Sequence, residues 1–439
     1  MRDTIIANIV LFGSLLALMA TGFPVAFCLV GIGVVGLFFY LGWGGTLGLV
    51  HLSIIDTTNF WVLYTIPLFI FLGCLMEKSG LAEDIYRGLR LWTQSLPGGL
   101  AVATVLLGIL VGSISGESSA SVVTEGIICL PPMEKYKYDK NLTMGCILGA
   151  AGLDILIPPS VLMIVYVVTA EVSIGRMWAG GYLPGLLLGG LYIGYIIVRC
   201  LLNPALGPVI PPAERVGWKE KLASLKYLIP PVFLIFAILG SVFGGILAPS
   251  ESAALGCSIT LIWGLASRRL KWRGLLDSCY TTMRLTTMIM WIIITAKVFK
   301  TLYFFSGAGH IGDYIAALSM SEWTGIIVVQ AILLFLGFFL DPFVIILLIM
   351  PIVKPLIDTF GLNPIWFGEL FIINMILSLV TPPVGLNIFY FKSITPEGTT
   401  MQDLYASAIP FAILTLIGLV LVIIFPQIVL WLPNLIYGK

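Results

Sequence analysis

Long apolar runs recur along the whole of this 439-residue sequence, and they constrain its fold more than any other feature. A helix needs about 20 apolar residues to cross the hydrocarbon core of a bilayer. Hydrophobic residues make up 59% of the chain and charged residues only 10%, whereas a soluble domain has about half and about a quarter. The sequence therefore predicts an all-α polytopic membrane protein and excludes a large soluble enzyme. Membrane spans are expected at about 5–20, 24–42, 61–76, 141–170, 178–200, 228–247, 251–267, 284–304, 366–391 and 407–432.

Two further apolar stretches, at about 100–131 and 324–356, are interrupted near their middles. The first interruption is the Gly- and Ser-rich segment 112–119, and the second is the segment 337–342, which ends in Asp-Pro. Each half is too short to cross a bilayer, and irregular backbone at membrane depth is tolerated only inside protein or around a wet cavity. Both stretches are therefore predicted to form re-entrant helical hairpins.

Two of the expected spans are also interrupted, in each case by adjacent prolines. Pro158 and Pro159 divide the span at about 141–170, and Pro382 and Pro383 divide the span at about 366–391. Proline has no amide hydrogen, so it leaves carbonyl groups of the preceding turn without a donor. Carbonyl groups freed in this way need a partner in hydrocarbon, and a sodium ion is a suitable one.

The distribution of basic residues tests this topology, because cytoplasmic loops carry an excess of Lys and Arg. If each hairpin returns to the side that it left, one set of loops carries 16 basic residues and the other set carries 3. The first hairpin is then expected to open to the cytoplasm and the second to the outside, with both termini outside. Amphipathic segments at about 80–92 and 307–318 are expected to lie along the two interfaces.

Four landmarks recur in the same order in the two halves of the sequence, which indicates an internal duplication. The paired residues are Pro24 and Pro249, Ser79 and Ser306, Pro131 and Pro351, and Pro158 and Pro382, at offsets of 220 to 227. Five full crossings separate Pro24 from Pro249, and an odd number inverts the second copy. We expect inverted repeats at 1–200 and 227–439, joined by a cytoplasmic linker at 201–226. Repeats of this kind, with discontinuous helices, occur in many secondary transporters.

Polar residues at the two hairpin tips are candidates for binding ions. The first tip concentrates serines and glycines, and helix amino termini with free amides and hydroxyls suit an anionic group and a hard cation together. Packing of small residues between helices is the alternative. At the second tip, a bare carboxylate on Asp341 would cost roughly 2.5–3.5 kcal/mol at mid-bilayer depth. We assign Asp341 to a cation site, with helix capping before Pro342 as the alternative.

Other charged residues in apolar segments have simpler explanations. Glu251 follows Pro249 and is expected to be a helix amino-terminal charge. Arg284 either reaches the cytoplasmic interface or pairs with a buried acid. Glu117 and Glu125 could relay protons, which leaves a proton-coupled organic-anion carrier, working without a binding protein, as the alternative function. A membrane-embedded enzyme is disfavoured, because the polar residues gather at hairpin tips rather than around a nucleophile and a base.

Seven segments together resemble the large membrane subunit of tripartite ATP-independent periplasmic (TRAP) transporters, the DctM type of the ion transporter superfamily. The resemblance implies an elevator-type, sodium-coupled, binding-protein-dependent secondary importer of small organic anions such as carboxylates or sulfonates. The hairpins and broken helices would form the mobile transport domain, and the other helices the scaffold. The segments are 67–73 (PLFIFLG), 96–101 (LPGGLA), 112–116 (GSISG), 155–160 (ILIPPS), 249–254 (PSESAA), 339–342 (FLDP) and 381–387 (TPPVGLN).

The resemblance also implies ligands for two sodium ions, with the substrate between the two tips. The first sodium site would use Ser113, Ser115, Ser118, Asp154 and Pro158. The second would use Gly337, Asp341, Thr381, Val384 and Gly385. Substrate contacts would come from Ser115, Gly116, Ser119, Pro159, Ser160, Thr381, Pro383 and Asn387.

The chain departs from the family pattern at two acids. Glu117 stands where the family usually has a small polar residue, and Asp154 where it usually has glycine. The implied partners are a small four-helix TRAP membrane subunit and a periplasmic substrate-binding protein, in the lipid bilayer of a bacterial inner membrane. Nucleic acid is not an expected partner, because a net charge of +1 provides no basic face. The identity of the anion is left open.

Overall fold

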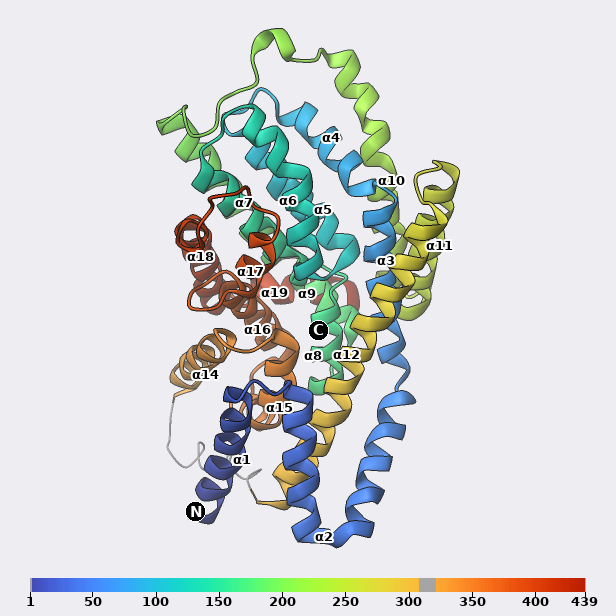
Figure 1. Ribbon diagram of the computed structural model, residues 1–439, viewed down its shortest axis with the longest axis vertical. Coiled ribbons are helices and arrows are strands. Elements are labelled where there is room, and N and C mark those ends of the chain that lie inside the picture. The colour runs from blue at the N-terminus through green and yellow to red at the C-terminus, as the bar shows by residue number, and fades with distance from the viewer. Residues whose placement is uncertain (1, 308–320, 439) are drawn as a thin grey trace.

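The computed structural model describes residues 2–307 and 321–438, and all the regular elements in these ranges are helices (Figure 1). In the first half they are α1 (Arg2–Ala20), α2 (Val25–Thr58), η1 (Trp61–Tyr64), α3 (Thr65–Lys78), α4 (Leu81–Thr93), α5 (Gly99–Ser115), α6 (Ser118–Lys135), α7 (Lys140–Gly152), η2 (Leu153–Ile155), α8 (Val161–Ala170) and α9 (Ile174–Leu202). They continue with η3 (Pro212–Glu214), α10 (Trp218–Phe243), α11 (Pro249–Ala266), α12 (Trp272–Phe305), α14 (Glu322–Gly337), α15 (Pro342–Thr359), α16 (Pro364–Leu379), α17 (Leu386–Lys392), α18 (Met401–Ile424) and α19 (Gln427–Tyr437).

Seven helices in the described part of the chain are long and apolar enough to cross a membrane. They are α2, η1 with α3, α9, α10, α12, α15 and α18, and shorter apolar helices include α5, α8, α14 and α16. Composition and length therefore agree with the prediction of an all-α polytopic membrane protein.

Two expected spans end elsewhere than predicted. The helix expected at 24–42 continues to Thr58 after a bend at Gly42, whose φ of 66° lies in the left-handed region. The bend gives α2 the V shape at the foot of Figure 1. The single span expected at 407–432 is two helices, α18 and α19. Pro426 lies between them, and proline disfavours helical backbone in the residue that precedes it.

The predicted interruptions are confirmed as helix boundaries. α5 ends at Ser115 and α6 begins at Ser118, while α14 ends at Gly337 and α15 begins at Pro342. The proline pairs fall between η2 and α8 and between α16 and α17. The order of two apposed helices followed by an interrupted helix thus occurs once in each half of the chain.

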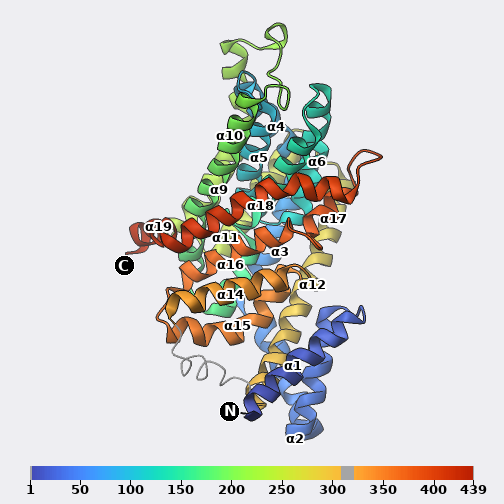
Figure 2. The ribbon, with the colours of Figure 1, turned by 90° about the vertical axis from the view of Figure 1, so that its left-hand side faces the viewer.

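The helices pack into two groups. α12 runs beside α2 and α3, and α11 packs against α3 and α10. The interrupted helices and hairpin arms form the other group, in which α7 contacts α5, α6 and α18, and α16 contacts α14, α9 and α18. Figure 2 shows α14, α15, α16 and α18 crossing the direction of α10 and α12. The amphipathic segment predicted at 80–92 is α4, which buries one face against α5 and α10. Its counterpart at 307–318 lies outside the described residues from 308 onward.

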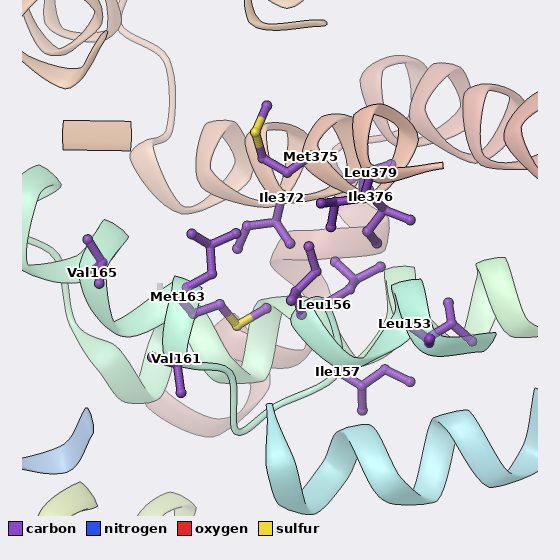
Figure 3. Packing of buried hydrophobic residues seen from close by; sticks show 14 of the residues in the cluster. Leu153, Leu156, Ile157, Val161, Met163, Val165, Ile372, Met375, Ile376 and Leu379 are labelled. Carbon is purple, nitrogen blue, oxygen red and sulfur yellow. The ribbon is translucent and has the colours of Figure 1, made fainter. Parts of the chain in front are cut away.

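The centre of the second group is an apolar seam between the first interrupted helix and α16 (Figure 3). Ile365 to Leu379 are all buried in α16, as are Leu142 to Gly152 in α7. Helices that are apolar on every face belong in a protein interior. Figure 3 shows Leu156 and Met163 on one side of the seam, with Ile372 and Ile376 on the other. The seam fixes the first helix interruption against the second half of the chain.

The linker predicted at 201–226 crosses the ends of the first hairpin. The Gly98 amide before α5 donates to the Gly207 carbonyl at 3.0 Å, and the Asp139 amide after α6 donates to the Leu206 carbonyl at 2.9 Å. Tyr136 donates a 2.6 Å hydrogen bond to the Glu214 carboxylate, which lowers the pKa of Glu214 together with the charge of Lys135. The linker is therefore bonded to the first hairpin on both sides.

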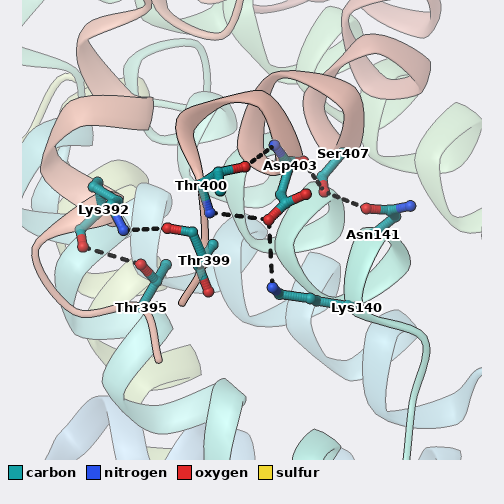
Figure 4. A network of polar contacts seen from close by, with 8 residues as sticks. All are labelled: Lys140, Asn141, Lys392, Thr395, Thr399, Thr400, Asp403 and Ser407. Atoms are coloured by element: carbon teal, nitrogen blue, oxygen red, sulfur yellow. Dashed lines mark hydrogen bonds and ion pairs between the residues drawn. The ribbon is translucent and has the colours of Figure 1, made fainter. Parts of the chain in front are cut away.

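A polar network joins the start of α7, the end of α17 and the start of α18 (Figure 4). The Thr400 hydroxyl accepts from the Asp403 amide at 3.1 Å, and Asp403 Oδ2 accepts from the Thr400 amide at 2.9 Å. These two bonds form a capping box. Lys140 pairs with the same carboxylate at 3.5 Å, and Ser407 donates to Asn141 at 3.1 Å. The network connects helices from both halves of the chain.

Candidate functional site

The first hairpin tip lies directly on the first helix interruption. Gly116 ends α5 with a φ of 63°, and its carbonyl accepts from the Val161 amide at 3.2 Å. A Cβ added at Gly116 would meet the Pro159 carbonyl oxygen and lie 2.9 Å from the Ser160 Cα. Only glycine fits, because both the backbone conformation and the close approach exclude a side chain. The structure thus brings together Gly116, Pro159 and Ser160 as predicted for one site.

Three of the four predicted tip serines have described side chains, and all three are buried. Ser113 Oγ donates to the Ile109 carbonyl at 2.7 Å, and Ser118 Oγ donates to the Ala151 carbonyl at 2.8 Å. Ser115 Oγ lies 3.3 Å from Ser121 Oγ. The fourth, Ser119, lies in α6, and its side chain is outside the described residues. Each described hydroxyl keeps lone pairs that could meet a cation.

Asp154 is the unusual residue beneath this tip. It lies in η2, is fully buried, and neither carboxylate oxygen has a hydrogen-bond partner among the described residues. Glu125 in α6 is buried and unpartnered in the same way. Gly112 makes room for Asp154, since a Cβ there would lie 2.8 Å from Asp154 Oδ1. Unpaired charges in a dry interior are costly, so these two acids require a cation or a proton.

The first interruption ends in a side-chain cap. Ser160 Oγ donates to the Ile155 carbonyl at 2.7 Å and accepts from the Met163 amide at 3.4 Å at the start of α8. Pro158, Pro159 and Ser160 are extended or turn-like between η2 and α8. The interruption thus exposes the amino terminus of α8 to the first tip, where the helix dipole favours negative charge.

At the second tip, Asp341 caps α15. Its Oδ1 accepts from the Phe343 amide at 2.9 Å. One oxygen of this carboxylate therefore caps the helix, as the capping alternative predicts. Gly337, at the end of α14, packs so closely on Ser378 that a Cβ would collide with the serine side chain. Sequence reasoning placed Gly337 and Asp341 on the same tip, and they border the same short turn between α14 and α15.

The second interruption has its own donors. Thr381 Oγ1 donates to the Leu377 carbonyl at 2.5 Å. The Tyr405 hydroxyl in α18 donates to the Pro383 carbonyl at 2.8 Å and lies 3.2 Å from the Val384 carbonyl. Gly385, with a φ of 63°, begins α17. One phenol thus reaches the carbonyls of two predicted ligands, a contact that no local sequence signal indicated.

The two tips meet across a small cavity of about 40 Å³. Asn387 in α17 donates a 2.7 Å hydrogen bond to Ser118 Oγ at the first tip. The volume holds water molecules or an ion but is too small for an organic anion. The lining residues are Gly116, Glu117, Ser118, Ile155, Leu162, Asp341, Pro342, Phe343, Leu379, Leu386, Asn387 and Tyr390.

The cavity divides the predicted site residues. Gly116, Ser118, Asp341 and Asn387 line it, as expected for residues between the tips. Ser113, Ser115, Asp154, Thr381, Pro383 and Val384 are not among its lining residues. Those from the first half lie behind the tip, and Pro383 and Val384 face Tyr405. The structure thus separates a shared cavity from polar groups set behind each tip.

Sequence reasoning missed several polar groups in this region. Asn374 in α16 donates to the Gln330 side chain of α14 at 2.7 Å, which ties the second hairpin to the second interrupted helix. Glu369 in α16 is buried with both oxygens unpartnered among the described residues. Tyr390 follows Asn387 by three residues on α17, a spacing that puts both on one helix face. Because Asn387 was already a predicted site residue, this spacing could have indicated Tyr390 as well.

The other charged residues of the apolar segments, Glu251, Arg284 and Glu117, have simple surroundings. Glu251 accepts from the Ala248 amide at 2.8 Å, which confirms it as a helix amino-terminal charge. Arg284 is exposed on α12, and no ion pair joins it to a buried acid among the described residues. Glu117 Oε2 accepts from the Ala120 amide at 2.8 Å in the first turn of α6, while Glu117 also lines the cavity.

Comparison with known proteins places the chain in a family. The profile of the tripartite ATP-independent periplasmic transporter DctM component matches residues 12–428. The C4-dicarboxylate TRAP transporter large permease protein DctM of Pseudomonas aeruginosa is 32% identical over 87% of this chain and 88% of its own length. The protein of the same name from Vibrio cholerae is 30% identical over 98% of both chains.

A solved structure supports the fold. The YdaH transporter of Alcanivorax borkumensis is similar with a TM-score of 0.61 at 14% sequence identity, covering 88% of this chain and 90% of that chain. At this identity the likeness concerns the fold alone. The family match and the identity to the Pseudomonas protein are the stronger findings, and they show that the chain belongs to the DctM family of tripartite ATP-independent periplasmic transporters.

Proposed function

We propose that this chain is the membrane permease subunit of a sodium-coupled, binding-protein-dependent importer of small organic anions. One observation carries the proposal. Residues of both hairpin tips and of the helix that follows the second interruption line one cavity, where Asn387 bonds to Ser118. Polar groups from two discontinuous elements at one point suit a carrier whose ions and substrate bind near the membrane midplane.

Sodium coupling is supported by buried acids that lack cationic partners in the described part of the chain. Asp154 and Glu125 are fully buried and have no hydrogen-bond partner in residues 2–307 and 321–438. A sodium ion held by Asp154 with the oxygen atoms of Ser113, Ser115, Ser118 and Pro158 would neutralise this charge. The second ion would use the free oxygen of Asp341 and the carbonyls of the second interruption, at Gly337, Thr381, Val384 and Gly385. Sodium is cargo here, and its gradient drives uptake.

We further propose that the two halves are inverted repeats that move as an elevator. Gly112 packs against Asp154, and Gly337, at an offset of 225, packs against Ser378, at an offset of 224. Similar contacts at nearly equal offsets support a duplication at 1–200 and 227–439. The group of hairpins and interrupted helices would slide against the group that contains α2, α3, α10, α11 and α12.

We base our proposals for the substrate and the partners on membership of the family. Family members are named for C4-dicarboxylates, ectoine, sialic acid and isethionate, so membership does not choose among ligands. We propose a carboxylate or sulfonate, supplied by a periplasmic binding protein, with a small four-helix subunit alongside. The inner membrane would hold the chain with both termini in the periplasm. An alkaline phosphatase fused to the carboxyl terminus should then be active.

The decisive experiment is uptake into proteoliposomes. The chain is reconstituted with the small subunit, and the binding protein is added outside with a panel of radiolabelled dicarboxylates, sugar acids, keto acids and sulfonates. Uptake that requires both an inward sodium gradient and the binding protein supports the proposal. Uptake that persists without sodium but collapses with a protonophore would instead identify a proton-coupled carrier, in which protons neutralise the buried acids. Conversion of an anion without net uptake would indicate an enzyme.

A further inference from the structure

A second cavity, of about 270 Å³, lies between α12, α15 and the end of α8. Three lysines line it: Lys297 and Lys300 on α12, and Lys354 on α15. Thr169 contributes a hydroxyl, and Asp358 is the one carboxylate in the lining. Most other lining residues are apolar, among them Ile293, Leu347 and Met350. We call this cavity the lysine pocket.

Three lysines and one aspartate give the lining of the lysine pocket a net positive charge, part of which Glu171 offsets from outside the lining. Lys354 Nζ is paired with Glu171 Oε2 at 2.7 Å. Among the described residues, the ion pairs within 4.0 Å include none for Lys297 or Lys300. Asp56 on α2 acts on Lys297 through space without forming such a pair. Lys297 is half-buried, and an ammonium group withdrawn from water gains free energy from a counter-charge. An anion in the pocket would supply it.

Two helices connect the lysine pocket to the cavity between the tips. Leu162 on α8 and Phe343 on α15 line the tip cavity, whereas Thr169 and Met350 on the same helices line the lysine pocket. Seven residues of α-helix span about 10 Å. Along each of these helices the two cavities are therefore about 10 Å apart. By the distribution of basic residues, the helix ends around the lysine pocket lead to outside loops.

We propose that the lysine pocket is an anion vestibule, where a carboxylate or sulfonate group pairs with Lys297 and Lys300 before the substrate reaches the tips. This inference rests on the proposed function. The apolar walls accept a short carbon skeleton, and the volume suits an anion of a few carbon atoms. Lys297 and Lys300 belong to the proposed scaffold and Lys354 to the proposed moving group, so the pocket changes shape as the groups slide.

The pocket can be tested without knowing the substrate. Thr169→Cys places a thiol in the pocket in the full-length protein, held in discs of neutral phosphatidylcholine. Its modification is timed with 2-sulfonatoethyl methanethiosulfonate and with the trimethylammonium reagent of similar size, and mass spectrometry reads residue 169. We expect the sulfonate to be favoured about tenfold relative to a free cysteine. The preference should fall with Lys297→Gln and with Lys300→Gln but not with Lys271→Gln, at the far end of α12.

Transport provides the second measurement. Lys300 is exposed, so Lys300→Gln should fold and should raise the half-saturating concentration for uptake about three- to tenfold with an unchanged maximal rate. Lys297→Arg should keep the wild-type value, because it keeps the charge.

Equal reagent preference in wild type and in the lysine variants would overturn the inference. So would a lysine effect confined to discs with anionic phosphatidylglycerol, since the pocket would then hold a lipid headgroup. Absence of uptake by the wild type beside an intact reagent preference would refute the proposed function and leave the anion pocket standing.

Discussion

Asn387 donates a 2.7 Å hydrogen bond to the hydroxyl of Ser118, although 269 positions separate the two residues. Ser118 in turn donates to the Ala151 carbonyl of α7 at 2.8 Å. One buried chain of hydrogen bonds thus connects α17, the first hairpin tip and the first interrupted helix. Ser118 serves both halves of the protein.

Replacing Asn387 with Ala should therefore damage transport more than stability. One buried hydrogen bond contributes about 0.5–1.5 kcal/mol to folding, but the tips would lose their direct link. We expect an uptake rate at least tenfold lower with a melting temperature close to wild type, measured by proteoliposome uptake and by intrinsic fluorescence. Asn203→Ala, in the exposed linker, is the control. Wild-type uptake by the Asn387 variant would disprove a role for the link.

Gly116→Ala should destabilise the protein far more than Gly361→Ala. Both glycines have a φ of 63°, but nothing lies within 4 Å of a Cβ at Gly361, whereas a Cβ at Gly116 meets the backbone of Pro159 and Ser160. The left-handed conformation alone costs about 1–2 kcal/mol, and the collision adds about 1–3 kcal/mol. Thermal melts of the two variants provide the comparison. Similar melting temperatures would mean that the tip does not lie against the interruption.

Asp341→Asn separates capping from ion binding. Asparagine caps helices about as well as aspartate, so the bond to the Phe343 amide should survive and the melting temperature should stay within a few degrees. The charge is lost, and sodium-dependent uptake should fall by more than tenfold. If uptake keeps its sodium dependence, Asp341 is a cap and nothing more. Asp341→Ala, which loses both roles, should show the same transport defect and a lower melting temperature.

Asp154→Ser introduces at the first interruption the residue that occupies position 378 in the second half. Without sodium the variant should melt higher than wild type, because it no longer buries a carboxyl group that has no hydrogen-bond partner among the described residues. With sodium, wild type should gain stability through binding, and the variant should gain less. Melts in sodium chloride and in choline chloride at equal ionic strength give both numbers. Glu369→Gln removes another buried, unpartnered acid and should leave the sodium-induced shift unchanged.

Tyr405→Phe should weaken the second interruption. The phenol reaches the Pro383 and Val384 carbonyls at 2.8 and 3.2 Å, and its loss removes a hydrogen bond that contributes about 0.5–1.5 kcal/mol. We expect a lower melting temperature and a higher sodium concentration for half-maximal uptake. Tyr64→Phe removes an exposed hydroxyl that donates to the Thr58 carbonyl at 2.8 Å, and it should change neither. An unchanged sodium dependence in the Tyr405 variant would separate this contact from ion binding.

The sequence predicted the local breaks better than the helix lengths. Proline and glycine act on the backbone directly, so the interruptions at Pro158 and Pro382 and the tips at Gly116 and Asp341 fell where expected. The span predicted at 24–42 stops at the bend at Gly42, because hydropathy does not distinguish a bend from a helix end. Pro426 lies inside a continuous apolar run. The run predicts one span at 407–432, although the proline by itself indicates a helix boundary.

Contacts between distant segments were the least predictable part. The landmarks placed Ser118 and Asn387 near one site only through family resemblance, and nothing local pairs Tyr405 with the Pro383 carbonyl. Asn374 with Gln330, and the lysines of α12 with α15, likewise meet only through packing. Such contacts depend on helix positions that apolar periodicity does not specify, since α16 is buried on every face.

The linker bonds at Gly98 and Asp139 give the segment between the two proposed repeats a mechanical role. A linker between two repeats needs only to be long enough to join them. Here the linker is also hydrogen-bonded to both ends of the first hairpin. Separating the two ends of the hairpin would first require breaking the hydrogen bonds to the Gly207 and Leu206 carbonyls. The linker between the proposed repeats thus restrains the two ends of the first hairpin relative to each other.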